Sequence, residues 1–408
     1  MIPSAQAPRA RPRVCFLYIA QAHQVLHSLS AACELALARP DVQVDVAATS
    51  AEVLDYARLV ARLTRPAPIG WRLLGPPWLQ ELKWFDGLPP KALALIANAP
   101  QLARYDVIVA PERTTALLRR LGVRAKLVYT QHGAGDRAGP FEPRLGRFDL
   151  VFAAGVKQRD RMIGEGLVRP ERCAVVGYPK FDIVDQLNPG LPKLFPTERP
   201  IVLYNPHFSA TLGSWPDWGL KVLRAFAHQD RYNLIFAPHL RLFGARPAAE
   251  IPELAPFRGL PNIHFDTGGS SAAIDMTYTR MAHVYLGDVS SQVYEFIRRP
   301  RPCVFLNPRG VAWQGDDSYR HWTFGPVLNS PDRLIDAIDA ARSHGRLYLA
   351  AQQAGFRITF ETDDGLSSER AATAIAGLLP DAPRPETPTP QRLIRPAPDA
   401  AARGPLPV

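Results

Sequence analysis

Short runs of apolar, β-branched residues alternate along the chain with longer stretches that carry apolar residues at helical spacing. The first run, at 14–19, is followed by helical spacing over 22–39. The same alternation predicts strands at 42–47, 107–110, 126–130 and 150–153, and helices at 51–63 and 114–121. Strands that alternate with helices favour a mostly parallel sheet with helices on both faces.

A second series of the same kind follows residues 188–200, NPGLPKLFPTERP, whose proline and glycine content is typical of an inter-domain connection. It predicts strands at 201–204, 234–237, 284–286 and 303–306, and helices at 218–228 and 291–298. We therefore expect an α/β fold of two doubly wound, Rossmann-like domains that face one cleft.

These patterns place the first domain at 13–187 and the second at 200–345, followed by a helical segment at 346–379. Residues 380–408 contain nine prolines and few large apolar side chains. Such a segment cannot bury enough apolar surface to fold, so we expect a disordered tail.

The composition is that of a globular protein, with 47% hydrophobic and 21% charged residues in 408. Four scattered cysteines without a CxxC spacing exclude a disulfide scaffold and a zinc module, and favour a reducing compartment. No run reaches the roughly 18 apolar residues of a membrane-spanning helix, and the N-terminus lacks a long apolar core. We expect a cytoplasmic protein.

The formal net charge is +10, which favours anionic partners such as nucleotide diphosphates, phosphorylated glycans or acidic lipids. The positive charge is spread along the chain and no recognised nucleic-acid module is present, so we do not expect nucleic acid as a partner. A basic RNA- or anionic-lipid-binding protein is the non-enzymatic alternative.

Ligands of doubly wound sheets bind beyond the carboxyl ends of the strands. Polar segments stand at or near the predicted strand ends: QHG at 131–133, GYPKFD at 177–182, NPH at 205–207, PHLR at 238–241 and GDVSS at 287–291. The chemistry is expected there.

Asp288, Ser290 and Ser291 lead into the last of these helices, where backbone N–H groups and hydroxyls suit a phosphate. Glu295, one turn further on, is placed to accept hydrogen bonds from ribose hydroxyls. The alternative is that Asp288 and Ser290 only cap the helix.

Three histidines follow predicted strands. His132 precedes a flexible Gly-Ala-Gly stretch, and its near-neutral pKa suits the removal of a proton from a hydroxyl. His239, close to Arg241, is a candidate ligand of a donor phosphate, and His207 either contacts phosphate or packs in its loop. A structural role in loop or core is the alternative for each.

The order QHG, GYPKFD, YNP, APH, GDVSSQVYEF and RPCVFLNP, between Val107 and Pro308, resembles the CDP-glycerol glycerophosphotransferase family, which includes teichoic-acid primases and polymerases. The resemblance implies a GT-B-like fold, with a CDP-alcohol donor in the C-terminal half and an acceptor in the N-terminal half. It implies no cofactor and no metal in the chemistry.

Position by position, the resemblance makes His132 the catalytic base and His239 a second catalytic histidine near the donor phosphates. Ser290 and Ser291 match the serines of the donor helix, and Glu295 stands where the family often has aspartate. The predicted donor-binding residues are Asp288, Ser290, Ser291, Glu295, Arg241 and His207, and the predicted acceptor-side residues are Gln131, Gly133 and His23.

Two positions depart from the family pattern. Asp136 replaces a lysine that is common after the HG motif, and His207 replaces a threonine. These changes bear on the acceptor and on the alcohol carried by the donor.

The expected activity is transfer of glycerol phosphate, or a similar polyol phosphate, from a CDP-linked donor to a hydroxyl of a glycan or lipid-linked acceptor, with release of CMP. The enzyme alternatives on this architecture are a nucleotide-sugar glycosyltransferase and a UDP-sugar 2-epimerase. Peripheral contact with the anionic inner face of the cytoplasmic membrane is a further expectation.

Several other motifs give weaker signals. His23 and His27 share a helical face, but Gln24 replaces the glutamate that a zinc protease needs beside its first histidine. Residues 268–271, GGSS, lack a Walker lysine. Trp71, Trp78 and Trp84 predict core packing, with contact to a lipid-linked acceptor or membrane as the alternative. The polar segment 313–322 predicts a lid on the donor side.

Overall fold

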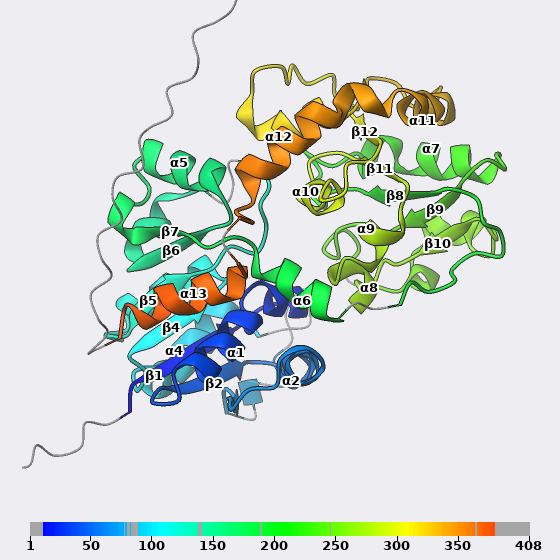
Figure 1. The fold of residues 1–408 in the computed structure, drawn as a ribbon. Coiled ribbons are helices and arrows are strands. Elements are labelled where there is room, and N and C mark those ends of the chain that lie inside the picture. Colours follow the sequence, from blue (N-terminus) through cyan, green and yellow to red (C-terminus); the bar gives the residue numbers. More distant parts are fainter. Residues whose placement is uncertain are drawn as a thin grey trace, which may run out of the picture.

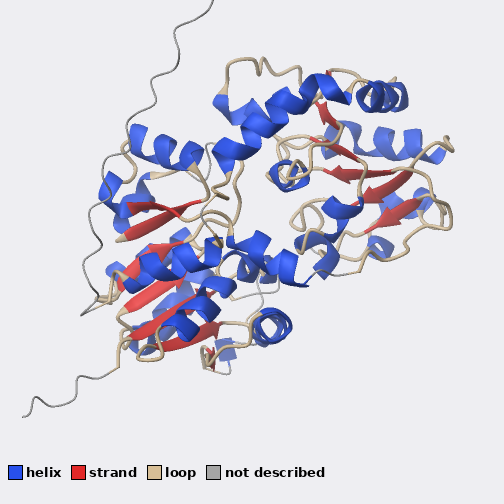
Figure 2. Cartoon of the chain, in the orientation of Figure 1, coloured by secondary structure: helices blue, strands red, loops and turns tan. Residues whose placement is uncertain are grey.

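The computed structural model describes residues 11–76, 78–79, 82, 89–137, 141–187, 190–244, 246–363 and 365–379. Its strands form two separate sheets, one in each half of the chain, with helices around both (Figures 1 and 2). This confirms the predicted α/β architecture of two doubly wound units. The predicted tail at 380–408 and Trp84 lie outside the described residues.

The first sheet has seven parallel strands in the order β3-β2-β1-β4-β5-β6-β7. Its strands are β1 (Arg13–Tyr18), β2 (Gln43–Ala48), β3 (Gly70–Leu73), β4 (Val107–Ala110), β5 (Lys126–Tyr129), β6 (Leu150–Ala153) and β7 (Cys173–Val175). The helices of this half are η1 (Ala22–His27), α1 (Leu29–Ala38), α2 (Ala51–Thr64), α4 (Lys91–Leu102), η2 (Arg113–Arg119), η3 (Pro143–Arg147), α5 (Val156–Gly164), η4 (Pro170–Arg172) and α6 (Pro179–Leu187).

The second sheet has six parallel strands in the order β10-β9-β8-β11-β12-β13. Its strands are β8 (Ile201–Asn205), β9 (Asn233–Phe236), β10 (Ile263–Phe265), β11 (Val284–Gly287), β12 (Cys303–Leu306) and β13 (Val327–Leu328). The helices are α7 (Trp215–Ala227), η5 (Ala248–Glu250), η6 (Pro252–Phe257), α8 (Ser271–Ile274), α9 (Thr277–Met281), α10 (Gln292–Phe296), η7 (Asp317–Phe324), α11 (Leu334–Ser343), η8 (Gly345–Tyr348), α12 (Leu349–Thr359) and α13 (Ser367–Ala376).

The central strands read as unbroken apolar runs because both faces of each sheet are covered. In β1, Val14 and Phe16 join a core on one face, while Cys15 and Leu17 join a core on the other. The second sheet is packed between two cores in the same way. Alternate residues of a strand point to opposite faces, so a strand buried on both sides shows no polar alternation.

The end of the chain crosses back to the first half. Helix α13 packs on α1 and α6 (Figure 1). The backbone N–H of Ser368 donates to Asp182 at 2.7 Å, and that of Tyr178 donates to the Ser367 hydroxyl at 3.0 Å. The two halves are therefore joined by α6 and by the C-terminal helices.

Several predicted elements differ from the structure. Residues 114–121 were expected as a helix, and the structure has a 3-10 helix, η2, that ends two residues earlier at Arg119. The helix expected at 291–298 is reduced to the five residues of α10.

In both sheets the strand order reverses beside the first strand, at β1/β4 and at β8/β11. Such switch points are where doubly wound folds bind ligands.

Candidate functional site

A cavity of about 1040 Å³ is lined by loops that follow the strands at both switch points. All predicted site residues except Asp288 line it: His23, Gln131, His132, Gly133, His207, His239, Arg241, Ser290, Ser291 and Glu295. Residues more than 150 positions apart are thus brought to one space.

The loop after β5 fits this space because it is glycine-rich. A Cβ built on Gly135 would lie 3.0 Å from the Cβ of Ser291, and one on Gly133 would lie 3.2 Å from the Ser291 hydroxyl. Side chains at both positions would push the two halves apart. The Gly-Ala-Gly stretch therefore lets His132 approach the second half closely.

The hydrogen bond of His132 fixes its neutral tautomer. Its Nδ1 lies 2.9 Å from the carbonyl oxygen of Pro111. Because a carbonyl only accepts, Nδ1 carries the proton and Nε2 holds the lone pair. Burial lowers the pKa of His132 below its usual value of 6.5, an effect that the charge of Glu112 opposes. His132 is therefore a neutral ring at pH 7 with Nε2 able to accept a proton.

His207 and His239 carry the opposite tautomer. Nδ1 of His207 accepts from the backbone N–H of Ser209 at 3.0 Å, and Nδ1 of His239 accepts from that of Arg241 at 3.2 Å. Each neutral ring therefore has its proton on Nε2. Burial lowers the pKa of His207 to about 3 and that of His239 to about 4. Nε2 of His207 is buried without a partner among the described residues.

The cavity has an excess of positive charge. Five cationic side chains and two carboxylates line it: Lys91, Arg113, Arg137, Lys180 and Arg241 against Glu112 and Glu295. The guanidinium of Arg241 lies 4.3 Å from the ring centre of Phe208, between the donor-side histidines. Among the described residues, no carboxylate lies within ion-pair distance of Arg137 or Arg241. The donor side of the cavity, with Arg241 from the second half and Arg137 from the first, therefore has the unneutralised charge that an anion requires.

Glu295 was expected to accept hydrogen bonds from a ribose, but its carboxylate already has two partners from the first half. The Lys180 ammonium lies 2.7 Å and 2.9 Å from its two oxygens, and the Tyr178 hydroxyl donates at 2.8 Å. Burial and the nearby carboxylate raise the pKa of Tyr178 well above its usual value. Glu295 thus joins the two halves at the edge of the cavity, through the GYPKFD motif.

Asp288 was expected to bind the donor, but its carboxylate is fully buried and does not line the cavity. It accepts backbone N–H groups of His207 at 3.0 Å, Ser214 at 2.6 Å and Val289 at 2.6 Å. Burial raises its pKa, and these hydrogen bonds oppose the rise. A carboxylate at a buried strand end is stabilised by such N–H groups, so Asp288 positions the His207 loop instead of a ligand.

The two serines lie at the start of a very short helix. The Ser290 hydroxyl accepts the backbone N–H of Gln292 at 3.3 Å, while the Ser291 side chain makes no capping hydrogen bond. Because α10 has only five residues, its dipole is small, and the two hydroxyls are the main donors here.

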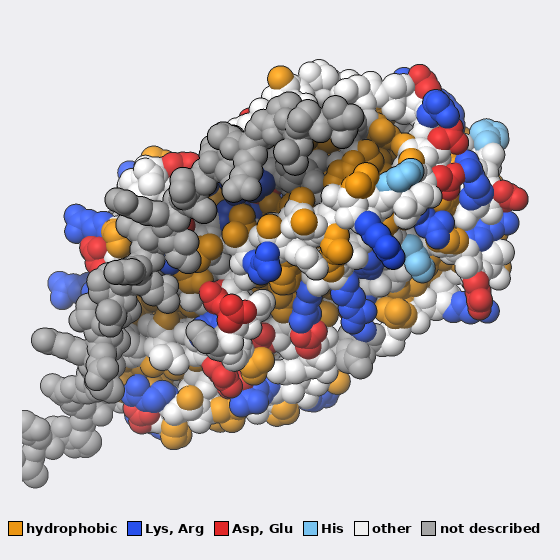
Figure 3. Space-filling model, turned by 45° about the horizontal axis from the view of Figure 1, so that its top comes forward, with side chains coloured by type: hydrophobic (Ala, Val, Ile, Leu, Met, Phe, Trp, Pro, Cys, Tyr) orange, Lys and Arg blue, Asp and Glu red, His pale blue; other side chains and the backbone are white. Residues whose placement is uncertain are grey.

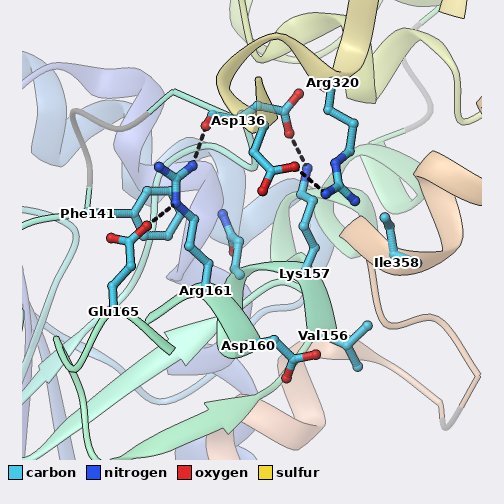
Figure 4. Close-up of a pocket in the computed structure, with 12 residues that line it drawn as sticks. Asp136, Phe141, Val156, Lys157, Asp160, Arg161, Glu165, Arg320 and Ile358 are labelled. Atoms are coloured by element: carbon cyan, nitrogen blue, oxygen red, sulfur yellow. Dashed lines mark hydrogen bonds and ion pairs between the residues drawn. The ribbon is translucent and has the colours of Figure 1, made fainter. Parts of the chain in front are cut away.

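A second pocket of about 410 Å³ lies on the other side of Asp136, between α5 and the C-terminal α12 (Figure 4). Its charges neutralise one another. Asp136 accepts from Lys157 at 2.7 Å, and Arg161 donates to Glu165 at 2.8 Å. This arrangement is a junction between the halves and not an anion site.

The segment 313–322 was expected to be a lid, but His321 and Trp322 are both 2% exposed. Nδ1 of His321 lies 2.9 Å from Asp136, and its Nε2 lies 2.9 Å from the carbonyl of Asp288. The indole of Trp322 donates to the same carbonyl at 2.8 Å. The polar residues of this segment are buried because Asp136 and Asp288 give them partners, so part of it is fixed in the interface.

Neither the family models nor the curated proteins gave a match to this chain. Solved structures did. The wall teichoic acid polymerase TagF superposes with a TM-score of 0.61 at 14% identity, over 90% of this chain and 88% of that chain. A UDP-GlcNAc 2-epimerase from Neisseria meningitidis, bound to UDP-GlcNAc, gives a TM-score of 0.53 at 11% identity, over 90% and 99%. The fold is GT-B-like.

A variant of TagF soaked with CDPG also superposes on this GT-B-like chain, with a TM-score of 0.58 at 13% identity, over 90% of this chain and 88% of that chain. Structures of this fold thus include ones determined with CDPG and with UDP-GlcNAc. The proteins named in these comparisons are a polymerase and an epimerase, and both are enzymes.

Two further observations concern metals and membranes. In the described part of the chain, no group of three His, Cys, Asp or Glu side chains is arranged to hold a metal ion. No helix within the same residues has the length and apolar character needed to cross a membrane.

On the face seen in Figure 3, Lys and Arg side chains are interspersed with Asp and Glu and do not gather in one basic patch.

Proposed function

We propose that this enzyme transfers glycerol phosphate, or a similar polyol phosphate, from a CDP-linked donor to a hydroxyl of a glycan or lipid-linked acceptor. The observation that carries the proposal is the pair of opposite tautomers across one cavity. His132 offers a lone pair from the first half, while His207 and His239 offer N–H groups from the second. A transfer between two bound substrates needs a base at the acceptor and donors at the leaving group.

In the proposed step, Nε2 of His132 removes the proton of the acceptor hydroxyl. The acceptor oxygen forms a bond to the phosphorus that carries the glycerol, and the bond from that phosphorus to the bridging oxygen breaks. CMP leaves with the electron pair of that bond. The proton is held on His132 and returns to solvent, so the products are a phosphodiester and CMP.

The second half supplies the groups that hold the diphosphate and the departing CMP. The Nε2–H groups of His207 and His239, the Arg241 guanidinium and the hydroxyls of Ser290 and Ser291 all line this part of the cavity. Hydrogen bonds from such donors to charged oxygens are stronger than those to neutral acceptors, and positioning dominates phosphoryl transfer.

A UDP-sugar 2-epimerase is the rival function, supported by the similarity to UDP-GlcNAc 2-epimerases. Both carboxylates of the cavity are already paired, Glu112 with Lys91 at 2.8 Å and Glu295 with Lys180 at 2.7 Å. Neither carboxylate is free to act as a base, whereas the imidazole of His132 has a free lone pair on Nε2. This favours proton transfer from a hydroxyl to an imidazole.

With a lipid-linked acceptor, the reaction would take place at the cytoplasmic face of the membrane.

Calorimetric titration with CDP-glycerol, CDP-ribitol and UDP-GlcNAc tests the proposal. We expect a CDP-alcohol to bind more tightly than UDP-GlcNAc, and His239→Ala to weaken that binding while the exposed His344→Ala does not. Preferential binding of UDP-GlcNAc, with turnover to its 2-epimer, would establish the rival function.

A further inference from the structure

The helix that follows β1, η1, contributes three side chains to the cavity lining, and each carries a buried polar atom without a partner among the described residues. Nδ1 of His23, Oε1 of Gln24 and Nδ1 of His27 are buried, and none has a hydrogen-bond partner among the described residues. Gln24 is 1% exposed and His27 is 4% exposed. Burying such an atom without a partner is unfavourable, so three of them on one helix favour a ligand that supplies the missing hydrogen bonds.

The geometry of η1 explains why these side chains gather. In a 3-10 helix, residues three apart lie over one another, so Gln24 and His27 share a face. The ring of His23 stands edge-on to that of His132, with 6.0 Å between the ring centres. The ring of His27 packs in the same way on Tyr178 at 5.1 Å. The ring of His23 therefore lies beside the proposed base, and that of His27 lies beside Tyr178.

This side of the cavity is electrically balanced. Glu112 accepts from Lys91 at 2.8 Å and from the Gln24 amide at 2.6 Å. Burial, with cations nearby, lowers the pKa of both His23 and His27 well below the usual value, so both rings are neutral at pH 7. On the donor side, by contrast, Arg137 and Arg241 have no carboxylate partner among the described residues.

We propose that η1 forms a subsite for the acceptor and that it takes an uncharged polyhydroxy end, a sugar or a polyol, in preference to a phosphorylated one. This rests on the proposed function, which puts the acceptor next to His132. A hydroxyl both donates and accepts, so it satisfies an imidazole nitrogen and an amide oxygen alike. A phosphate would bring two charges to a buried region whose nearby ammonium groups, Lys91 and Lys180, are already paired with Glu112 and Glu295.

Saturation-transfer NMR without any donor tests the subsite with named probes: methyl β-D-glucopyranoside, methyl N-acetyl-β-D-glucosaminide and ribitol, each against the wild-type protein. We expect at least one of them to bind, and CMP not to displace it. We expect glucose 6-phosphate, by contrast, to be displaced by CMP, because the unpaired arginines lie on the donor side.

The variants His27→Phe and Gln24→Met each remove an unpartnered polar atom with little change in side-chain size, and Gln24→Met also removes the amide that donates to Glu112. Each should weaken binding of the uncharged probe roughly three- to tenfold, the loss expected for one hydrogen bond. His344→Phe, on an exposed residue at the end of α11, is the matched control and should change nothing. Thermal unfolding identifies a variant that does not fold. In that case the binding measured with the other variant tests the subsite.

The subsite is refuted if none of the three probes binds, if CMP displaces the bound probe, or if both folded variants bind it like wild type. These outcomes are separate from failure of the proposed function, which shows as a lack of CDP-alcohol binding. If a probe binds through η1 while CDP-glycerol does not bind, the sugar subsite is supported and the transferase is refuted.

Discussion

Removing the ammonium of Lys180 should destabilise the protein strongly, because this side chain neutralises a buried carboxylate between the two halves. Its Nζ lies 2.7 Å and 2.9 Å from the oxygens of Glu295, and the two side chains are 6% and 7% exposed. In Lys180→Met, Glu295 keeps only the hydroxyl of Tyr178 as a partner.

Breaking a buried ion pair by removing one partner costs about 3–5 kcal/mol, since the remaining charge is left desolvated. Replacing both partners by neutral groups is close to neutral by comparison. We therefore expect Lys180→Met to lose about 3–5 kcal/mol of unfolding free energy, and Lys180→Met/Glu295→Gln to recover most of it.

Urea unfolding, followed by tryptophan fluorescence and by circular dichroism, measures these differences. The control is Arg333→Met. The Arg333 side chain is 84% exposed and forms an ion pair with Asp336. It should cost no more than about 1 kcal/mol. The reasoning is refuted if Lys180→Met costs no more than this control, or if the double variant is less stable than Lys180→Met alone.

Three further predictions concern the histidines. His132→Gln should lower turnover about 10²–10⁴-fold, because a general base adds to the rate and little to donor binding. Calorimetry should find the affinity for CDP-glycerol retained. An equal loss of affinity would assign His132 to the donor site. The acid limb of kcat/KM should lie below pH 6.5, because burial lowers the pKa of His132 and activity is lost only as the ring protonates; a limb at or above 6.5 contradicts this. His207→Phe should weaken donor binding by about 1.5–3 kcal/mol, the worth of a hydrogen bond to a charged group; unchanged affinity would leave His207 a packing role.

The sequence was sufficient for the main strands and for most of the cavity. Strands such as β4 and β12 are apolar throughout, because both faces of each sheet are covered. The short strands β3, β7, β10 and β13 were not predicted, since two to four residues at or near a sheet edge give little pattern. Residues at strand ends were found because parallel topology brings those ends together.

The pairings between the halves were not predictable from the sequence. Lys180 lies in a motif that was noted, but its partnership with Glu295 depends on how two domains dock. The same is true of His321, whose burial requires Asp136 from the other half. Asp288 shows a different limit. A carboxylate after a strand can bind a ligand or accept hydrogen bonds from nearby backbone N–H groups, and only the three-dimensional structure of the loop distinguishes the two.

The most direct test of the account is phosphorus NMR of the protein incubated with CDP-glycerol and a hydroxyl acceptor such as methyl β-D-glucopyranoside. The account predicts that the diphosphate signals disappear, that CMP and a new phosphodiester appear in equal amounts, and that His132→Gln abolishes both products. CDP-glycerol that stays intact, under conditions in which the same protein converts UDP-GlcNAc, would contradict it.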